Sequence, residues 1–229
     1  MLFNKILDIF RKENLLMQAY ELSYKMLEMD LEMFKKSVSF LRKSIGKEFD
    51  FDIYAYDKKI NEYERDVRKK VMTHLAFSNP TDVAPSLILI SIIINIERIG
   101  DYTKNISELA VNYPMTLEGG KYEEMLENIE TNLTKNFKDL ISCFKKYNIK
   151  VAKEIMDDNA QINKKINDIL DEMTKEEKSE FSTREGIVLA LYFRFLKRIS
   201  SHVKNVASSI VNPFHKIGFK AEEIEGNLK

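Results

Sequence analysis

A segment with helical spacing of apolar residues occurs twice in this 229-residue chain. Residues 96–112, IERIGDYTKNISELAVN, align without a gap over residues 196–212, LKRISSHVKNVASSIVN, and six of the seventeen positions are identical. A weaker match relates DKKIN at 57–61 to NAQIN at 159–163. Because self-similar segments at corresponding places in a chain indicate a repeat architecture, we predict two copies of one structural unit.

Each copy is predicted to contain three long helices. Apolar residues recur with a period of about 3.6 residues, the spacing of an amphipathic helix, rather than alternating as in a strand. With only seven glycines and four prolines, the chain has few residues that interrupt regular structure. The predicted helices cover residues 13–45, 52–77 and 82–112 in the first half, and residues 120–147, 149–173 and 183–212 in the second half.

The predicted fold class is therefore all-α. Three helices joined by short connections favour an antiparallel bundle, and the duplication favours two such bundles in tandem. Each has roughly the 100 residues that are usual for a domain. We place the first repeat at residues 1–115 and the second at residues 116–229.

Charge and composition restrict the functional class. Thirty-six basic and thirty-six acidic side chains cancel to a net charge of zero, so the basic surface expected of a nucleic-acid-binding protein is missing. A single cysteine excludes an intramolecular disulfide framework. The most apolar window, Leu87 to Ile96, is ten residues long, against roughly 20 residues for a membrane span. With no secretion signal recognised at the N-terminus, we expect a cytoplasmic protein.

Acidic side chains follow that apolar window. Glu97 and Asp101 lie one helical turn apart and therefore share a face of their helix. Asp57, Asn61 and Glu64 likewise share a face of the preceding helix, which is expected to run antiparallel beside it. Oxygen ligands from two neighbouring helices suit a hard cation. These five side chains are the predicted metal ligands.

Ordinary ion pairing is the alternative explanation of the same acids. Arg98, Lys104 or Arg68 could neutralise them, with each surface pair contributing less than about 1 kcal/mol to stability. Acids spaced four residues apart are common on helices, so the spacing alone favours ion pairs over a metal site.

Two motifs resemble a known family. NIERIGDYTKNI at 95–106, which follows an apolar helix and a proline-containing turn, resembles the E-R-I-G-D motif of the PhoU family of phosphate-uptake regulators. DKKINEYE at 57–64 resembles the D-x-x-I-N-x-x-E pattern on the second helix of that family. The duplicated three-helix plan also matches, so the resemblance covers almost the whole chain.

The resemblance implies metal ions, or multinuclear iron or zinc clusters, held by pairs of acids on the second and third helices of each repeat. Carried onto this chain, Asp57 and Asn61 form one pair, and Glu97 and Asp101 form the other. Asn61 stands where the family has an acid. An amide keeps an oxygen ligand but removes a charge, so we expect weaker cation binding than at a site with four carboxylates.

The second repeat departs further from the family pattern. The four corresponding positions are all without a carboxylate: Asn159, Asn163, Lys197 and Ser201. Lys197 and its neighbours Arg194 and Arg198 make the region basic, which repels a cation. We expect Lys197 to pair with an acid, for which the candidates are Glu154, Asp157 and Asp158. The sequence thus predicts at most one metal site, in the first repeat, with iron, zinc, manganese or magnesium as candidate ions.

The resemblance also implies the function. It indicates a non-enzymatic regulator of phosphate uptake or phosphate signalling, with the ATPase of a phosphate ABC transporter and a sensor histidine kinase as partners. Such a protein reaches the membrane only through its partners, and a homodimer is a further expectation. Two alternatives stay open: a metal-dependent hydrolase that uses Glu97 and Asp101, and a helical adaptor that holds no metal.

Overall fold

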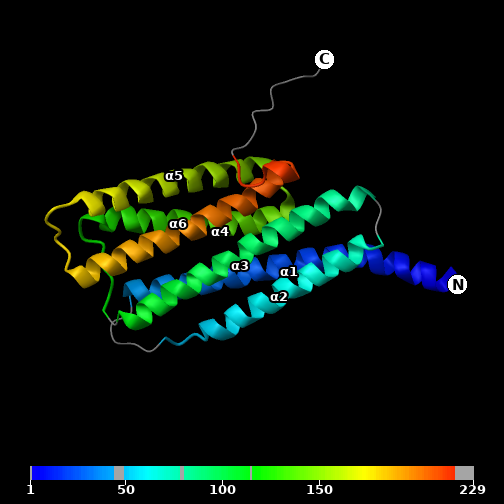
Figure 1. Cartoon of the computed structure of the whole chain (residues 1–229), viewed down its shortest axis with the longest axis horizontal. Coiled ribbons are helices and arrows are strands. Elements are labelled where there is room, and N and C mark those ends of the chain that lie inside the picture. The colour runs from blue at the N-terminus through cyan, green and yellow to red at the C-terminus, as the bar shows by residue number, and fades with distance from the viewer. Residues whose placement is uncertain (1, 44–48, 78–79, 114, 220–229) are drawn as a thin grey trace, which may run out of the picture.

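The computed structural model describes residues 2–43, 49–77, 80–113 and 115–219, with the backbone alone along 2–14. Within these ranges the secondary structure is helical, as Figure 1 shows. The six long helices are α1 (Leu2–Lys43), α2 (Ile53–Leu75), α3 (Val83–Asn112), α4 (Glu123–Lys146), α5 (Ile149–Lys175) and α6 (Thr183–Val211). The predicted all-α class and the duplicated three-helix plan are confirmed, whereas the division at residue 115 stays a prediction.

Five of the six helices begin and end within three residues of the predicted ranges. The exception is α1, which begins at Leu2 instead of residue 13. Residues 2–13 contain neither glycine nor proline, so no residue there ends the helix. Figure 1 shows the N-terminal part of α1 projecting past the other helices.

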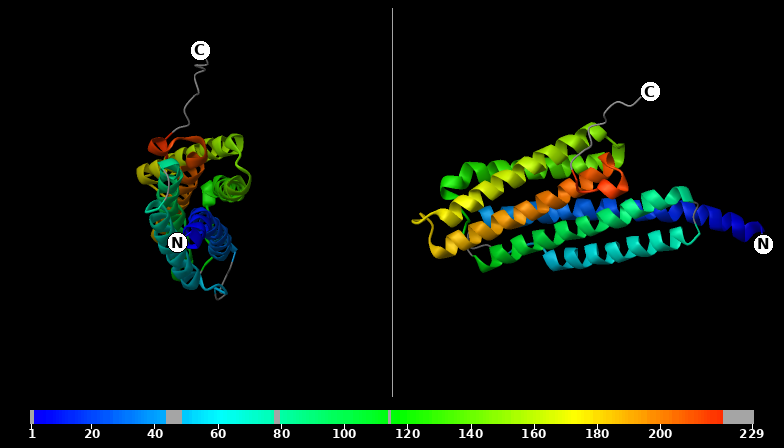
Figure 2. Two further views of the ribbon diagram at one scale, coloured as in Figure 1. Left: turned by 90° about the vertical axis from the view of Figure 1, so that its right-hand side faces the viewer. Right: turned by 45° about the horizontal axis from the view of Figure 1, so that its top comes forward.

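The helices of each repeat pack side by side along their lengths (Figure 2). In the first repeat α1 contacts both α2 and α3. In the second repeat α5 packs against both α4 and α6. Side-chain caps hold the starts of α2, α5 and α6. The most complete is at α6, where Ser182 and Glu185 form a reciprocal capping box.

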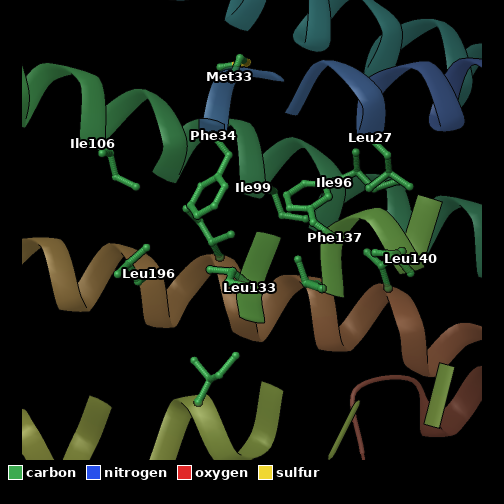
Figure 3. Close-up of a cluster of buried hydrophobic side chains, with 14 of the residues drawn as sticks. Leu27, Met33, Phe34, Ile96, Ile99, Ile106, Leu133, Phe137, Leu140 and Leu196 are labelled. Carbon is green, nitrogen blue, oxygen red and sulfur yellow. The ribbon is translucent and has the colours of Figure 1, made fainter. Parts of the chain in front are cut away.

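The two repeats share one core instead of forming separate units. Helices α3 and α6 pack against each other. They run in antiparallel directions, since Asn95 contacts His202 at 3.0 Å while the ring of Tyr102 lies 6.4 Å from that of Phe195. On the other side Phe34 of α1 stacks on Phe137 of α4, with 6.4 Å between ring centroids. Figure 3 shows both rings among buried aliphatic side chains that include residues of α3 and α6.

A polar network also joins the repeats. The guanidinium of Arg42, near the end of α1, forms ion pairs with Glu123 and with Glu130 of α4, the latter at 3.1 Å. The hydroxyl of Tyr192 on α6 donates a hydrogen bond of 2.7 Å to the Glu130 carboxylate. Arg42 and Glu130 are largely buried. Their pairing compensates for the loss of hydration of both charges.

Helix α3 occupies the centre of this arrangement. By length and composition, the segment Pro80–Asn112 is the one helix in the described part of the chain that could cross a membrane, with a hydropathy of 1.7 over its most apolar window. In the structure α3 packs against α1, α2 and α6. A core helix of a bundle passes the same test of length and composition.

Candidate functional site

The structure brings the predicted acids of α2 and α3 together around one lysine. The ammonium nitrogen Nζ of Lys104, on α3, lies 2.8 Å from Oδ1 of Asp57 and 3.4 Å from Oδ1 of Asp101. All three side chains are partly exposed, by 18 to 28%. Burial lowers the pKa of Lys104, but the two carboxylates outweigh it and raise the pKa above its ordinary value. Lys104 is therefore held in its charged form between two acids from different helices.

Glu97 lies in the same region with less compensation. Its side chain is 16% exposed, and the nearest cation is Nε of Arg98, 3.7 Å from Oε2. Burial and the charge of Asp101 raise the pKa of Glu97 to about 7, with Glu64 and Asp57 adding to the effect and Arg98 opposing it. The cluster therefore carries more negative charge than its neighbouring cations offset.

The side chains of the two remaining predicted ligands interact with other residues of α2. The amide nitrogen of Asn61 donates hydrogen bonds to the backbone oxygen of Asp57 at 3.0 Å and to its carboxylate at 3.5 Å. Glu64 forms an ion pair with Arg68 one turn further along α2. Arg98 Nη1 also contacts Asp101 Oδ2 at 3.1 Å.

The ion pairs expected as the alternative to a metal site are thus present, with Arg68, Arg98 and Lys104 each contacting an acid. In the part of the chain that the structure describes, no three acidic, histidine or cysteine side chains lie close enough together to hold a metal ion as they stand. The metal site at the five predicted residues stays a prediction.

One acid beside this cluster was missed by the sequence analysis. Asp30 of α1 is completely buried, and neither of its carboxylate oxygens has a hydrogen-bond partner among the described residues. Its Oδ1 lies 2.9 Å from the point that a Cβ atom on Gly100 would occupy. Glycine at position 100, between Glu97 and Asp101 in the chain, therefore lets the carboxylate approach α3.

The surroundings of Asp30 favour its neutral form. Burial raises the pKa of this carboxyl well above its ordinary value, and the charges of Glu97, Asp101 and Asp57 raise it further. A signal for Asp30 was present in the sequence, because it lies four residues after Met26 and four before Phe34, on the apolar stripe of its helix. An acid on such a stripe needs a compensating group or a function.

In the second repeat the corresponding polar groups satisfy one another. Asn159 is completely buried; its Oδ1 accepts a 2.8 Å hydrogen bond from Ser200, and its amide nitrogen donates to the backbone oxygen of Ile155. Asn163 donates to the hydroxyl of Ser201 at 3.1 Å. These pairs join α5 to α6 without any charge.

Lys197 differs from our expectation. Its ammonium donates to the amide oxygen of Asn167 on α5, and not to Glu154, Asp157 or Asp158. Those three acids lie about two and a half to three and a half turns before Asn167 on α5. Burial and the charges of Arg194 and Arg198 lower the pKa of Lys197. The region is basic, as predicted, and repels cations.

Comparison with known proteins gives the family and the fold. A family model described as the PhoU domain matches residues 24–110 and again residues 125–210. The structure of the phosphate transport system regulatory protein PhoU from Streptococcus pneumoniae is 20% identical, with a TM-score of 0.74 over 87% of this chain and 95% of that chain. PhoU from Pseudomonas aeruginosa is 17% identical, with a TM-score of 0.77 over 87% and 96% of the two chains. No curated protein sequence matches the chain.

Proposed function

The chain belongs to the PhoU domain family, and from this membership we propose that it is a regulator of phosphate uptake or phosphate signalling that acts through contacts with other proteins. The match of two PhoU domains to residues 24–110 and 125–210 is the observation that carries the proposal. The similar fold from S. pneumoniae belongs to a protein named as a regulator of a phosphate transport system.

The partners in this role are the ATPase of a phosphate ABC transporter and a sensor histidine kinase, with repression of uptake when phosphate is abundant. The protein acts in the cytoplasm, meets the membrane through these partners, and associates with a second copy of itself. The absence of net charge supports protein partners over nucleic acid. Helical surfaces, rather than a catalytic centre, carry the regulation.

A bound cation in the first repeat belongs to the same proposal. Carboxylate and amide oxygens are the donors that hard cations prefer. The pKa of Glu97 is raised first by burial and then by the charge of Asp101, and a bound cation would offset both effects. The ligands are drawn from Asp57, Asn61, Glu64, Glu97 and Asp101, and the candidate ions are iron, zinc, manganese and magnesium. The metal joins α2 to α3 and stabilises the bundle as its concentration rises above its Kd.

Phosphate uptake in cells tests the regulatory role. Deleting the gene from its own organism should leave uptake high in phosphate-rich medium, and a plasmid-borne copy of the wild-type gene should restore repression. A purified phosphate-transporter ATPase from the same organism should bind the purified chain saturably. Unchanged uptake in the deletion strain, together with no ATPase binding, would contradict the proposal.

A metal-dependent hydrolase is the second candidate, and one observation favours it. The pKa of Glu97, about 7, is that of a residue able to act as a general base near neutral pH. Release of phosphate from p-nitrophenyl phosphate in the presence of Mn²⁺, lost in Glu97→Gln, would support an enzyme. Binding of the transporter ATPase by chelator-treated protein that has no such turnover would instead support an adaptor.

A further inference from the structure

An apolar groove lies at the end of the bundle from which α1 projects. It has a volume of about 450 Å³ and is formed where α1, the start of α3 and the ends of α4 and α6 come together. Most of its lining is aliphatic or aromatic, and includes Met17, Tyr20, Ile88, Phe144, Tyr147 and Ile210. Met17 is 58% exposed and Tyr147 is 70% exposed. Large apolar side chains gathered in a surface groove mark a contact site for another molecule.

Two tyrosines give this groove a defined shape. The hydroxyl of Tyr20 donates a 2.6 Å hydrogen bond to the backbone oxygen of Phe144, and the two rings stack with 5.3 Å between centroids. The hydroxyl of Tyr147 donates to the backbone oxygen of Ile210 at 3.3 Å. Because both rings are anchored in the free chain, contact with them costs little conformational entropy.

The backbone at Tyr147 also indicates a function for this surface. Tyr147 follows the last residue of α4 and has a φ of 24°, which residues with a β-carbon rarely adopt. Such strain is retained where the surrounding structure imposes it, and it occurs often at binding sites. Here it belongs to a large aromatic side chain that is mostly exposed beside the groove.

Helix α1 continues from the groove into the solvent. It runs without a break from Leu2 to Lys43, and its first twelve residues have a length of about 18 Å. Figure 1 shows this segment, residues 2–13, beyond the ends of the other helices. It also precedes residue 24, where the match to the PhoU domain begins, so the segment is a feature of this chain outside the matched domain.

The apolar pattern of the segment is continuous with the groove. Phe3, Ile6 and Phe10 precede Met17 and Tyr20 at alternating spacings of three and four residues, with a glutamate at the one intervening position of the series. This spacing places the positions on one face of a helix, as in the seam of a coiled coil. The face of α1 that lines the groove is therefore extended by the projecting segment.

This segment cannot reach the groove of its own chain. Met17 and Tyr20 belong to the same unbroken helix, and residues 2–13 contain neither glycine nor proline at which the helix could turn back. A second copy offers the same groove in the reverse direction. With two-fold symmetry each copy provides one segment and one groove, so both contacts form and neither surface is left open.

The charges of the segment favour a protein over a lipid surface. Residues 2–13 contain three basic and two acidic side chains. A helix that binds a membrane surface is instead rich in lysine and arginine on its polar face, which anionic lipids attract. The nearly balanced charge gives little such attraction, while it does not oppose contact with a second copy.

From the groove, the continuous apolar face and the unbroken helix, we propose that this end of the bundle is an interface between two copies of the chain. The projecting segment of each copy docks antiparallel in the apolar groove of the other, which brings positions 3 and 6 of one copy to Tyr20 and Met17 of the other. The proposal rests on the self-association included in the proposed function and names the surface that carries it.

Sedimentation velocity of the purified full chain tests the proposal. The wild type should form a dimer. Ile6→Lys in the segment and Met17→Glu in the groove should each weaken dimerisation by about thirtyfold or more, because each brings a charge into an apolar contact. The matched control is Val111→Lys, since Val111 is a 62% exposed apolar residue near the opposite end of α3 from the groove. That change should leave dimerisation as in the wild type, and circular dichroism should show equal helix content in all variants.

An equimolar mixture of Ile6→Lys and Met17→Glu gives the sharpest readout. In a mixed dimer one contact pairs the introduced lysine with the introduced glutamate, and the other contact is that of the wild type. The mixture should therefore dimerise at concentrations where neither variant does so alone. A mixture that stays monomeric would overturn the antiparallel arrangement.

The other contradictory results differ in what else they overturn. If both variants dimerise like the wild type, the groove is not the interface, while self-association stands. If the wild type is monomeric at every concentration, both the groove contact and self-association are wrong. Flotation of that monomer with phosphatidylglycerol vesicles would then assign the segment to a lipid surface. The regulatory role is decided separately, by phosphate uptake in the deletion strain.

Discussion

The two repeats have polar side chains at the same helix positions, but these side chains differ in chemical type. In the first, Asp57, Glu97 and Asp101 contact Lys104 and Arg98. In the second, amides and hydroxyls take their places, and Asn159 with Ser200 forms a buried, uncharged pair. Because the second repeat builds the same three-helix bundle without these acids, the fold does not require them. The acids of the first repeat are therefore not needed to build the bundle, and the cation of the proposed function would give them a role.

The same contrast extends to the first helix of each repeat. Asp30 lies opposite Gly100, whereas its counterpart Leu133, at the matching buried position of α4, belongs to a repeat with Ser200 at the position that matches Gly100. A buried acid and a glycine occur together in one repeat, and an apolar residue and a serine in the other. In the first repeat the two residues depend on each other, because Gly100 leaves the space that the carboxylate of Asp30 occupies.

The strongest test of this contrast transfers the acid to the wrong repeat. Leu133→Asp removes a fully buried aliphatic side chain and introduces a carboxyl without a cation. We expect a loss of about 4 kcal/mol or more in the free energy of unfolding, measured by urea denaturation at pH 7. The opposite change, Asp30→Leu, should stabilise the metal-free protein. Equal losses for the two substitutions would show that the repeats do not differ in their demand for an acid.

A smaller effect is expected from closing the space opposite Asp30. In Gly100→Ala the new Cβ would lie 2.9 Å from Asp30 Oδ1 and 3.3 Å from Ile60. We expect a destabilisation of about 1–3 kcal/mol from this overpacking, measured as a fall in the denaturation midpoint. In an Asp30→Ala background the same change should cost less, because the clashing carboxylate is gone. Additive losses in the double variant would place the strain elsewhere.

These contrasts also show what could be predicted from the sequence. Period and spacing, which are local properties, predicted the helix ranges and the antiparallel neighbours α2 and α3. They also predicted that Asp57 and Asp101 lie near each other, and both contact Lys104. Asp30 was missed because its significance depends on Gly100, 70 residues away in the chain, and a single acid in an apolar stripe does not alter its period. The predicted partner of Lys197 was wrong because the register between α5 and α6 places Asn167, and not the three acids, beside Lys197, and that register is set by tertiary packing instead of local spacing.

A further effect is expected on the pH dependence of stability, to which Glu97 of the first repeat should contribute. The pKa of Glu97 is raised to about 7 from an ordinary 4.5, so the folded state binds more protons between these values. Its contribution to stability is complete below about pH 4.5 and is lost as the pH rises through 7, by about 1–2 kcal/mol after solvent screening. Urea denaturation of chelator-treated wild type and Glu97→Gln across this range should differ by that slope.

Comparison with the variant is needed because other groups titrate in the same range. His202 of α6 has a pKa lowered to about 4 by burial and by the charges of Arg198 and Arg98, so its contribution to stability rises with pH instead. Asp30 has a raised pKa and acts in the same direction as Glu97. The difference between wild type and Glu97→Gln removes the contribution of His202. Parallel pH profiles would mean that Glu97 is ionised throughout this range in the folded protein.

The smallest expected effect comes from removing Lys104, the cationic side chain that contacts two acids of the first repeat. Lys104→Met removes the ammonium that contacts Asp57 and Asp101, which should cost the metal-free protein less than about 1 kcal/mol, as for other solvent-accessible pairs. The same change should tighten the binding of Mn²⁺, because the two acids lose their competing partner. Lys204→Met is the matched control, since Asn159 and Ser201 replace those acids in its repeat; it should leave Mn²⁺ affinity unchanged. If Lys104→Met weakened Mn²⁺ binding instead, Lys104 would not compete with the metal. It would then hold Asp57 and Asp101 in the positions from which they bind the metal, and the acids of the first repeat would depend on this lysine.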